Sequence, residues 1–304
     1  MPPTPPPMLL LGIGYGLLTA VAHAVAFAMS RRYIVQGHGS SLQLMVTSHA
    51  IMGPVALLVM LPFWSHELLN LAAWGPLMLG ASFSYLCGQA LFLIALRHSV
   101  SSRLVPLLGL KVVAVVPASI WVMGVKFGWP QVAAVALSLV AGAMLHHIGG
   151  RLPLRSLVLT LVAVCLFAIS DVCIVLLVRT LGQGFAASAR SVGVCYGFCG
   201  LAVLPLLPWH GSRHGSDWRA ALPHAACWLP SMYLLFACLG LCGAVLGNIV
   251  IGTRGLFAIA LGAILASRGM LHLEHHASRG VVARRFAAAV LMIVAIAIYG
   301  FGVK

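Results

Sequence analysis

Charge, and acidic charge above all, is what this sequence has least of. Only four of its 304 residues are acidic, namely Glu67, Asp171, Asp217 and Glu274, and charged residues of both signs make up 7% of the chain. Hydrophobic residues make up 62%, and the mean hydropathy is +1.06. A water-soluble domain needs far more charge on its surface. The composition therefore predicts an integral membrane protein whose solvent is the lipid bilayer.

The regular alternation of polar and apolar residues that marks barrel strands is also missing. The apolar runs are instead continuous for about 20 residues, the length of a helix that crosses a bilayer. The N-terminal MPPTPPP has no Lys or Arg for a signal peptide, so the first run is kept as a helix. The sequence predicts an all-α membrane protein with ten transmembrane helices, at residues 8–29, 41–63, 71–96, 103–123, 128–147, 156–179, 184–207, 222–241, 243–267 and 285–303.

Sequence patterns for catalysis and for bound metals are missing too. The chain has no GxGD and no Walker motif, and the HLEHH run around Glu274 lacks HExxH spacing. All eight cysteines lie inside apolar runs, where small buried side chains are expected rather than disulfides or metal ligands. With only one acid at membrane depth there is no pair of catalytic carboxylates. We therefore predict no metal, no cofactor and no enzymatic activity.

The two halves of the chain repeat at an offset of 143 residues. AVAHAVAFAMS, from Ala20, lies on AVCLFAISDVC, from Ala163. The same offset places further pairs in register: Leu61 and Pro62 on Leu204 and Pro205, and Lys111 on Arg254. Five helices are an odd number, so the second half would enter the membrane in the opposite sense. The pattern predicts two inverted five-helix repeats, 8–147 and 156–303, an architecture in which a central site opens to either side in turn.

Two stretches carry a family resemblance. They are ALRHSVSSRLVPLLGLKVVAVVPASIWVMG, which links the third and fourth predicted helices, and TRGLFAIALGAILASR of the ninth. Together with the five-plus-five layout, they resemble the drug/metabolite transporter superfamily in its ten-helix EamA-like branch, over nearly the whole chain. The resemblance implies transport. It names no substrate, because members move amino acids, nucleotide sugars, phosphorylated sugars and cationic drugs.

The basic residues give the chain a formal net charge of +14, and most of them lie in the short connections. We interpret them as contacts to anionic lipid headgroups, not to nucleic acid. The loops after the odd-numbered helices hold twelve bases, and the other side holds three, namely Lys126, Arg179 and Lys304. The positive-inside rule then places both termini outside the cell, whereas the family usually has them in the cytoplasm.

Four ionisable residues fall inside predicted helices, where a charge costs about 2.5–3.5 kcal/mol on insertion scales. Lys111 and Arg254 lie at mid-helix at equivalent positions of the two repeats, and we predict that they form one central positive site. Asp171 is the natural counter-ion. A static salt bridge and a proton-coupled or substrate-ammonium role both stay open for it. Arg190 lies near the start of its helix and is expected to snorkel to the interface.

The resemblance adds a comparison for the two bases. In the sugar-phosphate branch of the superfamily, basic residues on helices four and nine bind the substrate's phosphate, and Lys111 and Arg254 resemble them. That branch has a basic pair on helix nine, whereas the neighbour of Arg254 is Thr253.

Neutral polar and aromatic residues complete the predicted site. His23, Gln89 and Asn248 are expected to line the cavity, with hydrogen bonding between helices as the alternative. Tyr85 and Trp121 are expected to wall it, with ordinary packing as the alternative.

The sequence as a whole predicts a secondary transporter in a bacterial inner membrane. It would export or exchange small polar metabolites with a carboxylate or phosphate, by alternating access around the positive site. The alternatives are a flippase of a lipid-linked phosphate and, less favoured, a membrane-embedded lipid-modifying enzyme. The predicted partners are a small-molecule substrate and the bilayer, with proton coupling left open; no oligomeric state is predicted.

Overall fold

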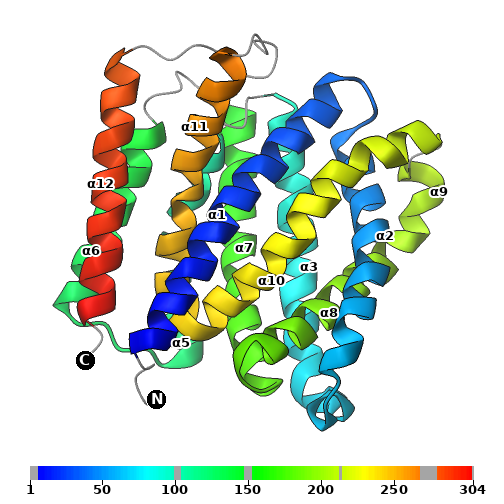
Figure 1. Ribbon diagram of the computed structural model, residues 1–304, viewed down its shortest axis with the longest axis horizontal. Coiled ribbons are helices and arrows are strands. Elements are labelled where there is room, and N and C mark those ends of the chain that lie inside the picture. The colour runs from blue at the N-terminus through cyan, green and yellow to red at the C-terminus, as the bar shows by residue number, and fades with distance from the viewer. Residues whose placement is uncertain (1–5, 99–103, 147–152, 212–213, 268–278, 303–304) are drawn as a thin grey trace.

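The computed structural model describes residues 6–98, 104–146, 153–211, 214–267 and 279–302, and every element in these ranges is helical (Figure 1). The first half contains α1 (Pro6–Val35), α2 (Ser41–Met60), α3 (Leu71–Leu96), α5 (Lys111–Met123) and α6 (Trp129–His146). The second half contains α7 (Leu154–Thr180), α8 (Gly184–Val203), α9 (Leu207–His210), α10 (Gly215–Gly252), α11 (Arg254–Ser267) and α12 (Arg279–Gly302). Short 3-10 helices join them: η1 (Leu61–Phe63), η2 (His66–Leu69), η3 (Val105–Leu110) and η5 (Leu204–Leu206). The predicted all-α class is confirmed.

Six of the described segments are long and apolar enough to cross a membrane. Three further apolar helices are shorter, at Leu107–Met123, Trp129–Ala141 and Val290–Tyr299. Continuous helix suits this environment, because a helix satisfies its own backbone hydrogen bonds where no water is available. The chain is therefore an integral, multi-pass membrane protein.

Several predicted boundaries differ from the observed ones. The helix expected at 8–29 runs from Pro6 to Val35, and the one expected from 222 begins at Gly215. Both extend past their apolar runs, since backbone hydrogen bonding continues into the polar interface. The helix expected at 184–207 ends at Val203, and 3-10 geometry follows at Pro205, which has no N–H to donate.

Two predicted helices are broken in the middle. The fourth is a 3-10 segment, η3, that becomes the α-helix α5 at Lys111, and Pro106 lies in the first turn of η3. The ninth is split at Thr253, where α10 ends and α11 begins. Within α10, Gly243 has φ 75° and ψ 173°, which no helix contains, and the chain turns back there towards α11 (Figure 1). Such broken helices give a membrane protein irregular backbone next to an internal site.

Four helix pairs make the most extensive contacts between distant parts of the sequence: α1 with α10, α3 with α7, α2 with α8, and α6 with α12 (Figure 1). The α2–α8 pair is held close by glycine. A Cβ added at Gly53 would lie 2.8 Å from Cα of Gly200, so only glycine fits there. Small residues at such crossings let the backbones approach and gain van der Waals contact, the main attraction between helices in lipid.

The HLEHH run and Glu274 lie outside the described residues.

Candidate functional site

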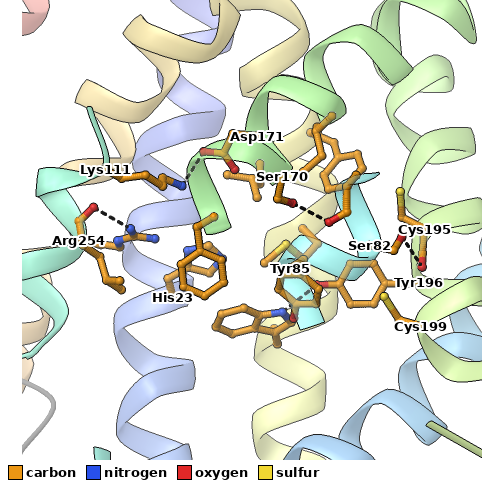
Figure 2. A pocket seen from close by; sticks show the side chains of 18 of the residues that line it. His23, Ser82, Tyr85, Lys111, Ser170, Asp171, Cys195, Tyr196, Cys199 and Arg254 are labelled. Atoms are coloured by element: carbon orange, nitrogen blue, oxygen red, sulfur yellow. Dashed lines mark hydrogen bonds and ion pairs between the residues drawn. The ribbon is translucent and has the colours of Figure 1, made fainter. Parts of the chain in front are cut away.

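A cavity lies among the helices, and both halves of the chain supply its walls (Figure 2). Its charged residues are Lys111 at the start of α5, Asp171 on α7 and Arg254 at the start of α11. All three side chains are almost fully buried, with residue exposures of 4%, 3% and 5%. The structure thus brings together the three charges that the sequence placed at one central site.

Lys111 and Asp171 form an ion pair. Lys111 Nζ lies 2.5 Å from Asp171 Oδ2. Asn248 Nδ2 donates a hydrogen bond of 2.7 Å to the same carboxylate oxygen and another of 2.8 Å to the Ala244 carbonyl within its own helix. The carboxylate is therefore held from two helices, and the amide of Asn248 fixes its position.

Arg254 has no such counter-ion. Its Nη2 donates to the carbonyl of Leu108 at 3.3 Å, and its Nε has no hydrogen-bond partner. None of the carboxylates that the structure describes lies within ion-pairing distance of its guanidinium. A guanidinium presents five N–H donors in a planar fork, so Arg254 keeps donors available inside the cavity. One acid and two bases leave this cluster with one excess positive charge.

The two bases occupy equivalent places in the backbone. Lys111 is the first residue of α5, directly after the 3-10 segment, and Arg254 is the first residue of α11, directly after the break at Thr253. The η3 backbone also reaches the second half, because Leu108 accepts the hydrogen bond from Arg254. Each base thus extends from the break of its helix, the position that the 143-residue repeat assigns to both.

His23 on α1 lines the cavity on the side of the two bases (Figure 2). Its ring stacks on the indole of Trp228, with 4.7 Å between the ring centroids and 18° between the planes. The residue is 2% exposed, and neither ring nitrogen has a hydrogen-bond partner. It is thus a buried polar side chain whose hydrogen-bonding groups are unused.

The opposite end of the cavity is aromatic, and sequence reasoning found only part of it. Tyr85 lies there as expected, but Tyr196 of α8 and Trp228 of α10 were not anticipated. Trp228 Nε1 donates to the Tyr196 hydroxyl at 2.8 Å, and the Tyr85 hydroxyl lies 3.2 Å from His49 Nε2. The sequence held a sign of their role, because both residues fall inside predicted spans. Trp and Tyr in membrane proteins usually gather at the interfaces instead.

The remaining predicted residues lie elsewhere. Trp121 is 91% exposed on α5 and is not a wall of the cavity, so its predicted place there is wrong. Gln89 is buried on α3 but does not line the cavity, and its amide has no partner. Arg190 on α8 also lies outside it, with Nη1 3.4 Å from Glu67 Oε2. Within the described parts of the chain, no three His, Cys, Asp or Glu side chains gather as a metal site requires.

A solved structure and a family model are similar to this chain. A crystal structure described only as "Crystal structure of protein" superposes with a TM-score of 0.67, covering 97% of this chain and 98% of the other at 16% identity, a likeness that shows the fold alone. No curated protein matches significantly. The model of the EamA-like transporter family matches residues 10–145, which span most of α1 to α6 and include Lys111 and the part of the cavity wall that the first half supplies. The resemblance read from the sequence is confirmed: these residues belong to the EamA-like transporter family.

Proposed function

We propose that this protein is a secondary transporter that binds a small organic anion, carrying a carboxylate or phosphate, at the cluster of Lys111, Asp171 and Arg254. The observation that carries the proposal is the charge balance in the cavity. Asp171 is already paired with Lys111, whereas Arg254 is buried and pairs with none of the carboxylates that the structure describes. An isolated buried charge is unfavourable, and a substrate anion would compensate it.

The backbone path supports ten crossings. The apolar segment Gly215–Leu265 has 51 residues, enough for two crossings of about 20 residues each, and Gly243 interrupts it. When this segment is counted as two crossings, the six long segments provide seven, and the three shorter apolar helices bring the total to ten. α1 begins and α12 ends at the same end of the molecule, which requires an even number of crossings (Figure 1).

The helix contacts support the inverted repeat of residues 8–147 and 156–303. In such a repeat α1 corresponds to α7, and α3 to the first part of α10. The α1–α10 and α3–α7 contacts are then equivalent under the two-fold symmetry. The α2–α8 and α6–α12 pairs each join a helix to its own counterpart, as helices near a two-fold axis must.

This symmetry supplies the mechanism. The two repeats would rock against each other, and the site between them would open to each side of the membrane in turn. The bound anion contacts Arg254 directly and Lys111 beside it. Asp171 of α7 pairs with Lys111, and Asn248 of α10 holds that carboxylate in place. Binding therefore connects the breaks of both repeats through one ligand.

The proposal is tested with purified protein in liposomes that are loaded with an unlabelled organic anion. Addition of the labelled anion outside should give uptake that depends on the internal anion and vanishes in protein-free liposomes. Absence of exchange across a panel of carboxylates and phosphate esters would refute the proposal. Movement of a lipid-linked phosphate between leaflets, without exchange of free anions, would favour a flippase instead.

A further inference from the structure

We propose that the anion carries a flat aromatic body, with its charged group at Arg254 and His23 and its ring against Trp228, Tyr196 and Tyr85. This inference rests on the proposed function and names the substrate class of the same site. It follows from a contrast between the two ends of the cavity: one holds unused hydrogen-bonding groups, and the other holds aromatic rings whose polar atoms are already bonded (Figure 2).

The charged end offers hydrogen-bonding groups that none of the described residues engages. Arg254 Nε and both ring nitrogens of His23 lack partners, although both side chains are buried. Buried polar groups are normally hydrogen-bonded, so unpaired ones in a cavity indicate a ligand that completes them. A carboxylate has two acceptor oxygens, so one can accept from the Arg254 guanidinium and the other from the ring N–H of His23.

At the aromatic end, the polar atoms of the rings already take part in hydrogen bonds within the protein. The Trp228 indole N–H donates to Tyr196, and the Tyr85 hydroxyl is bonded to His49. The serine hydroxyls that line the cavity donate to backbone carbonyls, Ser82 to Cys195 at 3.3 Å and Ser170 to Ala81 at 2.9 Å. What remains is ring surface. The ring centroid of Tyr85 lies 5.7 Å from that of Tyr196 and 6.4 Å from that of Trp228, on which the ring of His23 also stacks.

This arrangement selects against a polyhydroxy substrate. A sugar bound here would remove several hydroxyls from water. They would lie against rings whose polar atoms are already hydrogen-bonded, so the lost hydrogen bonds to water would not be replaced, which is unfavourable. An aromatic ring binds favourably in the same place, because it stacks or packs edge-on against Tyr and Trp and needs no hydrogen bond. Figure 2 shows His23 between the charged groups and the aromatic end, where it can contact the carboxylate while Trp228 contacts the ring.

The test compares two carboxylic acids that differ only in their hydrocarbon ring, together with one polyhydroxy phosphate. 3-Phenylpropionate and 3-cyclohexylpropionate have the same charge and nearly the same size, and glucose 6-phosphate serves as the polyhydroxy probe. Dissociation constants come from the rise in melting temperature of the detergent-purified protein with ligand concentration. We expect the phenyl acid to bind roughly 2- to 12-fold more tightly than the cyclohexyl acid, the range of an aromatic pair, and glucose 6-phosphate to bind least.

Three variants test which residues cause the preference for the phenyl acid. Trp228→Leu should abolish the preference for the phenyl acid, and Trp121→Leu, a matched change at a ring outside the cavity, should keep it. His23→Ala should weaken both propionates alike, because His23 contacts the shared carboxylate. Equal binding of the two propionates by the wild-type protein, or tighter binding of glucose 6-phosphate, overturns the inference while leaving anion transport intact. If no anion stabilises the wild-type protein, the proposed function fails and this inference with it.

Discussion

The buried pair of Lys111 and Asp171 makes a quantitative prediction about stability. The two side chains are each 5% exposed, and their charged atoms lie 2.5 Å apart. Removing one partner leaves the other charge uncompensated in the protein interior, which typically costs about 3–5 kcal/mol. Lys111→Met and Asp171→Asn should each lower the free energy of unfolding by that amount.

The double variant should recover much of this loss. Methionine replaces the apolar stem of the lysine, and the carbonyl of an asparagine at 171 still accepts the hydrogen bond from Asn248. Neither charge is then left alone. We expect the double variant to be more stable than either single variant, with a coupling free energy of at least about 2 kcal/mol.

The assay is reversible unfolding in mixed micelles with increasing SDS, applied to the four proteins of this cycle. Arg190 and Glu67 provide the matched control, because their 3.4 Å pair has a Glu67 side chain that is 49% exposed. The coupling in that pair should be much weaker than that between Lys111 and Asp171, because solvent screens an exposed pair. Additive losses at Lys111 and Asp171, or single variants as stable as the wild type, would refute the buried pair as a structural unit of the site.

Three further predictions concern the fold. Gly243→Ala should lower the free energy of unfolding by on the order of 1–3 kcal/mol, since the backbone region at φ 75° and ψ 173° suits only glycine; an unchanged stability would contradict the turn. Gly53→Val should separate α2 from α8 and destabilise the protein by about 1–3 kcal/mol, whereas Gly14→Ala, with no neighbouring atom within 4 Å, should not. In a cysteine-free background, Arg155→Cys should resist an impermeant thiol reagent added to intact cells, because this end of α7 lies on the arginine-rich side; labelling from outside would reverse the predicted orientation.

Local rules predicted much of the fold. The helix expected at 71–96 has those bounds, and the one expected at 41–63 is matched by α2 and η1 together. The interruption near residue 242 was also anticipated, and the structure places it at Gly243. Each of these depends on the length of an apolar run or on the local freedom of glycine, both of which a single sequence displays.

The site was predicted less completely, because its composition depends on which helix faces meet. Lys111, Asp171 and Arg254 could be found because charges in lipid are rare and unfavourable. Tyr196 and Trp228 come from α8 and α10, and only the packing of these helices against α2 and α1 turns them towards the cavity. Trp121 was misplaced for the same reason: its spacing along the chain does not say which face of the broken helix meets lipid.

The most direct test of the central claim is anion uptake into proteoliposomes by Lys111→Gln and Arg254→Gln variants that still fold and insert, with Arg254→Lys beside them. The labelled probe is a carboxylate that raises the melting temperature of the wild-type protein. Loss of the guanidinium removes charge-assisted hydrogen bonds of about 1.5–3 kcal/mol, so Arg254→Gln should weaken the apparent affinity roughly 10- to 100-fold. Arg254→Lys should restore it only in part, because an ammonium group lacks the planar fork. Wild-type rates and affinities in both glutamine variants would contradict the account, for these bases would then be structural and the anion would bind elsewhere.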